Sequence, residues 1–265
     1  MIKIAVSGKG GVGKTTIAGT LARFLAREKY DVLAIDADPS MNLASALGIK
    51  IPPPPLTEFR ELIEERAGGP AGFFKLNPRV DDIVEKFGVT GPDNVKLLVL
   101  GTVERGGSGC MCPASSFLKA LLRHVILKTN SVVILDMEAG VEHLGRASTK
   151  GIDMMIIVVE PGARSIETAG RIVELGRQIG IGKFGAVINK TPYLNTGTHK
   201  AREELAEIEG KLNEYGIPVI GVIPFDASLI RADMDGIAPI EGGGAAILAI
   251  KDMCEKVLIG KERLQ

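Results

Sequence analysis

The chain has 265 residues, 45% of them hydrophobic, and its 32 basic and 32 acidic side chains cancel to a formal net charge of zero. This composition can fill a large core, while the balanced charge argues against a general nucleic-acid or anionic-membrane surface, because both favour a cationic excess. Three cysteines that cannot all pair, no signal-peptide pattern and no apolar run of about 18–20 residues predict a cytoplasmic protein without a membrane span.

Short apolar, β-branched runs alternate with amphipathic segments along the chain. We predict strands at residues 2–7, 32–36, 95–100, 132–136, 154–159, 184–189 and 219–223. We predict helices between them at residues 15–29, 117–129, 165–179 and 201–215. Apolar runs without alternation are typical of strands buried on both faces of a parallel sheet. The pattern therefore predicts an α/β, doubly wound, mostly parallel sheet with helices on both faces and a ligand site beyond the carboxyl ends of its strands.

The interval between the second and third predicted strands is unusually long. It holds four consecutive prolines at 52–55, a predicted helix at 56–67 and a Gly/Pro-rich patch at 68–72. We interpret residues 50–94 as a helical insertion in a single domain that spans 1–265. Residues 245–258 are predicted to form a last helix that packs on the sheet. The alternative, a membrane-targeting tail, calls for a strongly basic face with large apolar anchors, which this segment lacks.

The most specific signal follows the first predicted strand. Residues 8–16 read GKGGVGKTT, which satisfies G-x-x-x-x-G-K-[ST] between a strand and a helix. Polyphosphate oxygens need many N–H donors at close range, and glycines let the backbone supply them. Lys14 would add a positive charge to the β- and γ-phosphates and Thr15 a hydroxyl ligand for Mg²⁺. A glycine-rich turn without a ligand is the alternative. The predicted ATP/ADP-binding residues are Gly8, Lys9, Gly10, Gly11, Val12, Gly13, Lys14, Thr15 and Thr16.

Lys9 narrows the class further. It gives the loop the pattern K-G-G-x-G-K-T, which resembles the deviant Walker A motif of the MinD/ParA class of P-loop ATPases. The resemblance implies that Lys9 crosses a dimer interface to the partner's nucleotide, and hence an ATP-dependent homodimer. A surface lysine without such a role is the alternative.

Acidic residues at two further strand ends match this class. The resemblance implies that Asp38 orients the attacking water and that Asp36 lies near the magnesium shell, in a segment that looks like switch I. Asp136 looks like a Walker B aspartate. Gly140, in a segment resembling switch II, would offer its N–H to the γ-phosphate. An aspartate at a strand end can also simply cap a helix or begin a turn, but two such ends converging on one P-loop favour a site.

Two later strand ends resemble the base-contacting loops of the class. Asn189 follows the sixth predicted strand and resembles the asparagine that reads adenine. Pro224 and Asp226 follow the seventh and resemble the second base-contacting loop. The chemistry expected of the whole site is in-line attack of water on the γ-phosphoryl group, with Lys9, Lys14, Asp38 and Asp136 as the catalytic group.

Two of the three cysteines, Cys110 and Cys112, stand one residue apart in a glycine-rich segment. In an extended segment such residues point to the same side, so both thiols can face one metal ion. The same segment of a second subunit would complete a four-sulfur site for Zn²⁺ or, flattened, for Ni²⁺. The alternative is that the cysteines act as small apolar side chains. A redox pair is disfavoured because a disulfide closing so short a loop is strained.

Within the MinD-like class the chain resembles the CooC-type ATPases, which assist nickel insertion into carbon monoxide dehydrogenase. The matching stretches are the Lys9-bearing loop, the CMCP of residues 110–113, and the DMEAG of residues 136–140 with its continuation through 142–146. The resemblance implies that Cys110 and Cys112 hold Ni²⁺ or Zn²⁺ across a dimer. It also implies that carbon monoxide dehydrogenase is the client, with acetyl-CoA synthase as an alternative client. His143 follows the segment that resembles switch II, where it would sense the nucleotide or touch the metal; a polar histidine of the switch loop without either role is the favoured alternative.

Two rival functions share the same phosphate loop. A positioning or partitioning ATPase would bind membrane or DNA and would carry a basic tail or patch. An iron–sulfur scaffold ATPase would carry a C-x-x-C motif, which this sequence lacks.

Overall fold

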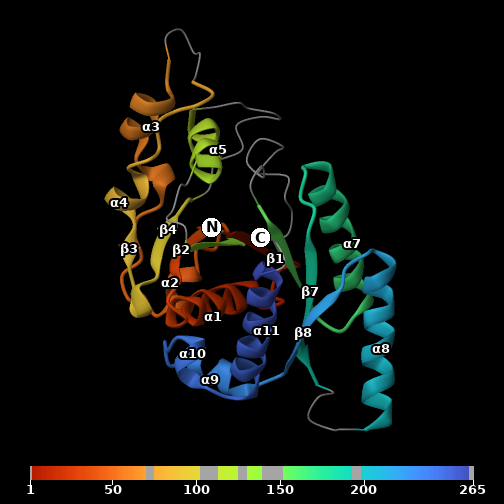
Figure 1. Cartoon of the computed structure of the whole chain (residues 1–265). Coiled ribbons are helices and arrows are strands. Elements are labelled where there is room, and N and C mark those ends of the chain that lie inside the picture. Colours follow the sequence, from red (N-terminus) through yellow and green to blue (C-terminus); the bar gives the residue numbers. More distant parts are fainter. Residues whose placement is uncertain are drawn as a thin grey trace.

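In the computed structural model, the described residues are 2–69, 75–101, 113–124, 130–138, 152–192 and 198–262. One sheet runs through this part of the chain (Figure 1), in the order β3-β4-β2-β5-β1-β6-β7-β8. Its strands are β1 (Ile2–Gly8), β2 (Asp31–Ala37), β3 (Val89–Thr90), β4 (Lys96–Val99), β5 (Ser131–Met137), β6 (Met154–Val159), β7 (Phe184–Thr191) and β8 (Val219–Pro224).

The seven predicted strands are confirmed to within two residues at each end. All of them pair in parallel, and only β3 pairs antiparallel, with β4. The prediction missed β3 because two residues carry no periodic pattern. The mostly parallel α/β fold is therefore confirmed, with one short antiparallel strand at the edge.

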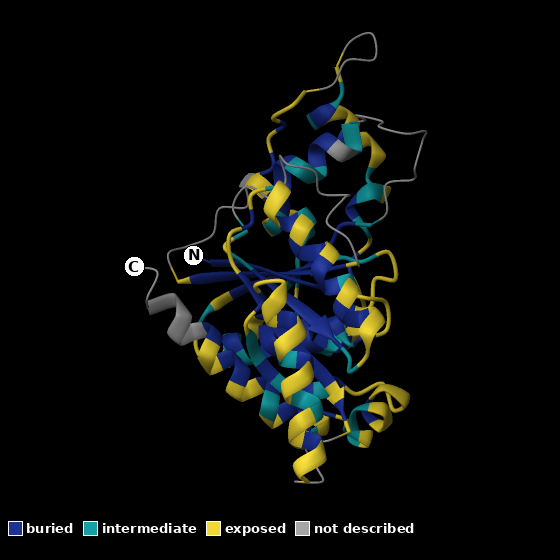
Figure 2. Cartoon of the chain, turned by 90° about the vertical axis from the view of Figure 1, so that its right-hand side faces the viewer, coloured by how far each residue is buried: buried dark blue, intermediate teal, exposed yellow. Residues whose placement is uncertain are grey.

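Helices cover both faces of this sheet (Figures 1 and 2). They are α1 (Lys14–Arg27), α2 (Leu43–Leu47), α3 (Arg60–Ala67), α4 (Ile83–Phe87), α5 (Pro113–His124), α7 (Ala163–Gln178), α8 (His199–Glu214), α9 (Ala227–Met234), α10 (Pro239–Gly242) and α11 (Ala245–Glu262). The described residues also include two short 3₁₀ turns, at Leu56–Glu58 and Pro92–Asn94. No helix in the described ranges is long and apolar enough to cross a membrane.

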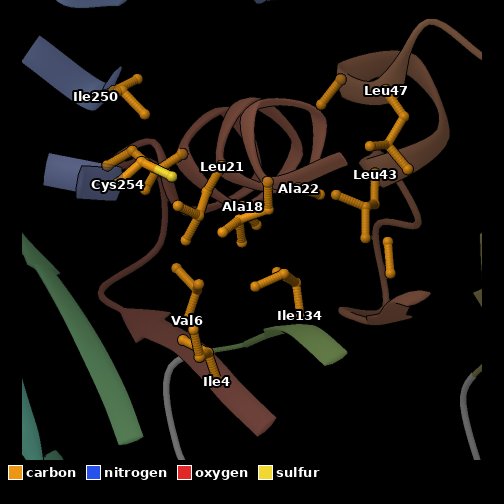
Figure 3. Packing of buried hydrophobic residues seen from close by; sticks show 14 of the residues in the cluster. Ile4, Val6, Ala18, Leu21, Ala22, Leu43, Leu47, Ile134, Ile250 and Cys254 are labelled. Atoms are coloured by element: carbon orange, nitrogen blue, oxygen red, sulfur yellow. The ribbon is translucent and has the colours of Figure 1, made fainter. Parts of the chain in front are cut away.

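Successive side chains of a strand point to opposite faces of the sheet, so the strands contribute to two separate hydrophobic cores. Ile4 and Val6 of β1 belong to the core that also holds side chains of α1, α2, α10 and α11, whereas Ala5 belongs to the core that holds side chains of α3, α5, α7 and α8. Figure 3 shows the first core, in which the side chains of α1 lie between β1, β5, α2 and α11. Cys254 of α11 is buried there, and burial raises the pKa of its thiol to about 12. The predicted packing of the last helix on the sheet is confirmed.

Several helix ends differ from the prediction for local reasons. The predicted helix 56–67 splits, because Phe59 has φ −82° and ψ 64°, and only Arg60–Ala67 is α-helical. Helix α1 ends before Lys29, whose φ of 68° is left-handed. Helix α5 begins at Pro113, four residues before the amphipathic stretch 117–129, since proline is well suited to a first helical turn. Residues 125–129 of that prediction lie outside the described residues.

Candidate functional site

The phosphate-loop motif lies between β1 and α1, at the carboxyl edge of the sheet. Gly8 ends β1 against β6, where a Cβ would collide with the carbonyl oxygen of Val158. Gly13 precedes α1 with φ 94°, and a Cβ there would lie 2.5 Å from the Asn189 Nδ2. Both positions therefore require glycine. Lys9 is exposed, and within the described residues no hydrogen bond or ion pair fixes its side chain.

Lys14 and Asp38 approach each other over this loop. The Lys14 side chain is only 6% exposed, and its Nζ lies 3.8 Å from the Asp38 Oδ2 and 3.5 Å from the Lys9 carbonyl oxygen. Asp38 also accepts hydrogen bonds from the backbone N–H and hydroxyl of Ser40. The structure thus brings together two residues that were predicted to act at the γ-phosphate: the Asp38 carboxylate lies beside the Lys14 ammonium at the start of α1.

Asp36 shapes the segment that follows β2. Its Oδ1 accepts from the Asp38 N–H at 3.1 Å, and its Oδ2 from the Leu43 N–H, the first of α2, at 2.9 Å. Burial raises the pKa of Asp36 to about 6, and the two backbone hydrogen bonds oppose this rise. The carboxylate therefore fixes both ends of the 38–43 turn that carries Asp38.

Asp136 lies beside Asp36, because β2 and β5 pair with these two residues in register. Burial raises the pKa of Asp136 to about 7; the Thr15 hydroxyl and Lys14 lower it, while the charges of Asp36 and Asp38 raise it. Neither oxygen of Asp136 accepts a hydrogen bond of ordinary geometry within the described residues, although Thr15 is near enough to affect its titration. A buried carboxyl group without such a partner fits a place for a divalent cation, which prefers oxygen ligands.

The end of β7 contacts the loop directly. Asn189 is 7% exposed and donates from Nδ2 to the Val12 carbonyl oxygen at 2.7 Å. Lys190 donates from Nζ to the Gly11 carbonyl oxygen at 2.6 Å and pairs with Glu160 at 2.7 Å. No motif in the sequence assigns a role to Lys190 or Glu160. Their only signal was their place directly after predicted strands.

Pro224 and Asp226 lie at the neighbouring strand end. Phe225 donates its N–H to the Thr191 carbonyl oxygen at 3.0 Å, which joins this loop to the end of β7. Asp226 caps α9 by accepting from the N–H of Ser228 at 3.0 Å, and it also accepts from the N–H of Ala246 at 3.0 Å. The Ser228 hydroxyl also donates to the Asp226 Oδ1, at 2.6 Å, and this bond, together with the backbone hydrogen bonds, holds the pKa of Asp226 below its usual range. Its carboxylate therefore serves two helix starts.

Several predicted site residues lie outside the described residues. These are Cys110, Cys112, Gly140 and His143. Within the ranges that are described, three or more His, Cys, Asp or Glu side chains nowhere gather in a metal-binding cluster.

Comparison with known proteins places the chain in a family. Residues 3–240 match the CobQ/CobB/MinD/ParA nucleotide binding domain. An uncharacterized ATP-binding protein of Methanocaldococcus jannaschii is 44% identical over 239 residues, covering 89% of this chain and 90% of that protein. The carbon monoxide dehydrogenase accessory protein CooC of Rhodospirillum rubrum is 42% identical over 244 residues, covering 89% of each chain.

Solved structures agree on the fold. The cell division ATPase MinD of Pyrococcus furiosus superimposes with a TM-score of 0.66 at 22% identity and covers 100% of this chain and 99% of its own. At this identity the likeness concerns the fold alone. Taken with the family match and the phosphate loop, it leads to one conclusion: the chain belongs to the CobQ/CobB/MinD/ParA nucleotide-binding family and is a CooC-type ATPase of its MinD/ParA class.

Proposed function

We propose that this ATPase dimerises with ATP and assists the insertion of nickel into carbon monoxide dehydrogenase. The observation that carries the proposal is the 42% identity to CooC, spread over 89% of the chain, in a sequence with the Cys110 and Cys112 pair. Balanced charge gives no support to a nucleic-acid partner. We also propose that residues 1–265 act as one P-loop domain in which 50–94 is an insertion.

The site residues take the following roles in this proposal. Backbone N–H groups of residues 8–16 cradle the phosphates of ATP, and the Lys14 ammonium neutralises charge that develops on the γ-phosphoryl group. Asp38, held beside Lys14 by the turn that Asp36 fixes, orients the water that attacks the γ-phosphorus while the bond to the bridging oxygen of ADP breaks. The Gly140 N–H would bind the same phosphate.

Mg²⁺ fits the group formed by Thr15, Asp36 and Asp136. The buried, unbonded oxygens of Asp136 and the nearby Thr15 hydroxyl are the observations that support this fit. When bound, the ion would neutralise phosphate charge and fix the geometry of the β- and γ-phosphates. We propose Thr15 as the ligand and Asp36 as an outer-shell residue, because both Asp36 oxygens already accept backbone hydrogen bonds.

Base recognition falls to the ends of β7 and β8 in this proposal. The Asn189 Nδ2 is engaged by the loop, so its Oδ1 remains to accept from the exocyclic amine of adenine. Pro224 and Asp226 would contact the base through their backbone, since the Asp226 carboxylate caps α9.

The lysines of the loop should separate two steps. Lys14→Ala is expected to abolish ATP hydrolysis, because the ammonium that neutralises charge on the γ-phosphoryl group is lost. Lys9→Ala should instead leave the protein monomeric with ATP and slow its hydrolysis, because Lys9 acts across the dimer. The checks are phosphate release and light scattering with ATP and with ADP. A Lys9→Ala protein that stays monomeric yet hydrolyses ATP at the wild-type rate would refute the shared site.

The thiol pair should decide metal binding. We expect the wild-type dimer to bind about one Ni²⁺ or Zn²⁺ per two chains in equilibrium dialysis, and Cys110→Ser/Cys112→Ser to lose it, since tetrahedral sites use four ligands. The matched control is Cys254→Ala, which removes the buried third thiol and should keep the metal. Dialysis with and without ATP tests the link to nucleotide. Unchanged metal binding in the double variant would reject the thiol site.

A further inference from the structure

The end of β7 directs two consecutive side chains at one loop. Successive residues of a regular strand point to opposite faces. Lys190 departs from this rule with a left-handed φ of 54°, and the register of β7 with β8 shifts between Ile188 and Thr191. Asn189 and Lys190 therefore both reach the phosphate loop. A non-glycine residue in this conformation is strained, so the surrounding contacts must stabilise it.

The two contacts fall on consecutive carbonyl groups of the loop. Lys190 Nζ lies 2.6 Å from the Gly11 oxygen, and Asn189 Nδ2 lies 2.7 Å from the Val12 oxygen. In a trans peptide the carbonyl and the following N–H point in opposite directions. Fixing the Gly11 carbonyl therefore turns the Val12 N–H to the other side, where it lies 3.5 Å from the Lys9 carbonyl oxygen that Lys14 Nζ also approaches. Fixing the Val12 carbonyl does the same for the Gly13 N–H.

Glu160 holds the lysine in this place. It directly follows β6, its backbone N–H donates to the Ser165 hydroxyl at 3.0 Å, and its Oε1 lies 2.7 Å from the Lys190 Nζ. A flexible ammonium beside a bound polyphosphate would otherwise be drawn towards the phosphate oxygens. The carboxylate of Glu160 opposes this pull and leaves the ammonium on the Gly11 carbonyl.

We propose that Lys190 is a positioning residue of the nucleotide site: held by Glu160, it orients the Gly11–Val12 peptide so that a loop N–H faces the phosphates. The inference rests on the proposed nucleotide site. It adds residues that act through the loop backbone and do not themselves touch ATP. The peptide planes of the loop are thereby oriented before ATP arrives, which preorganises the site.

The experiment measures binding of ATP and of inorganic tripolyphosphate to the full chain by calorimetry. Lys190→Met should weaken both by about tenfold, the effect expected from losing a hydrogen bond to a charged group. Lys190→Arg keeps a charged donor and should recover most of the affinity. The matched control is Lys211→Met, which breaks a lysine–glutamate pair on the surface of α8. The Lys211 side chain is 47% exposed and the Lys190 side chain 43%. The control variant should bind as the wild type does.

Glu160→Gln separates positioning from direct phosphate contact by sign. If Lys190 acts on the Gly11 carbonyl, loss of the Glu160 charge weakens binding, and the double variant is no weaker than Lys190→Met. If Lys190 touches phosphate itself, the same change frees it and tightens binding, which would overturn the proposal. A loss confined to ATP, with tripolyphosphate unaffected, would also overturn it by pointing to a base contact. A wild-type protein that binds neither ligand would reject the nucleotide site itself.

Discussion

Asp136→Asn is expected to make the nucleotide-free protein more stable at neutral pH and unable to hydrolyse ATP. The buried carboxyl group has its pKa raised from 3.8 to about 7, so folding at neutral pH opposes its ionisation. The rise corresponds to roughly 4 kcal/mol. The uncharged amide removes this cost but brings donors that need partners, so we expect a net gain of about 1–3 kcal/mol. We expect hydrolysis to be lost because the proposed Mg²⁺ site loses its carboxylate.

The pH dependence identifies the cause. The folded state holds the Asp136 proton more tightly than the unfolded chain, so the contribution of this group to folding stability is greatest below about pH 4. Its contribution is lost as pH rises to about 7. Asp36, with a pKa raised to about 6, acts in the same direction. The difference in Tm between Asp136→Asn and wild type should therefore grow from pH 5 to pH 8, measured without nucleotide or Mg²⁺. A difference that stays constant over this range would contradict the assignment.

Gly13→Ala is expected to cost both stability and nucleotide binding. Gly13 has φ 94°, and a Cβ there would lie 2.5 Å from the Asn189 Nδ2. The left-handed backbone alone costs alanine about 1–2 kcal/mol. Relief of the contact would also push Asn189 away from the Val12 carbonyl. We therefore expect a lower Tm and affinity for ATP reduced by at least about tenfold, because the loop N–H groups lose their orientation.

Gly210→Ala provides the control for that substitution. Gly210 is exposed within α8, and a Cβ there would meet nothing within 4 Å. The same change should raise stability by about 0.5–1 kcal/mol, because alanine is the better helix former. ATP affinity should not change. Equal losses of ATP binding in the two variants would show that the position of the glycine is irrelevant, contrary to the geometry of the loop.

Most of the fold was predictable from local sequence patterns. Each buried strand is a short apolar run that adjacent residues reveal, so all seven predicted strands are present in the structure. Strand β3 escaped because two residues give no period, and the 3₁₀ turn at Leu56–Glu58 escaped because Phe59 breaks a helix that its neighbours favour. Helix ends depend on single backbone angles, such as the left-handed φ of Lys29, which composition does not reveal.

The site divides in the same way. The phosphate loop was predictable, because its function needs a fixed spacing of glycines, lysine and threonine in one segment. The clash that excludes a Cβ at Gly13 was not, since it comes from Asn189 on another strand. The part played by Asp226 at two helix starts was also hidden, because the Ala246 N–H reaches it only in the folded chain.

The sequence by itself determined the strand and helix pattern, the phosphate loop and the resemblance to CooC-type ATPases, since each is a local arrangement of residue types. The tertiary structure decided that Asp36 and Asp136 lie side by side, because the sheet places β2 next to β5. It also decided that Lys190 contacts both Glu160 and the Gly11 carbonyl oxygen. That contact depends on one left-handed residue at the end of β7 and on strands brought together from distant parts of the chain, which no local pattern encodes.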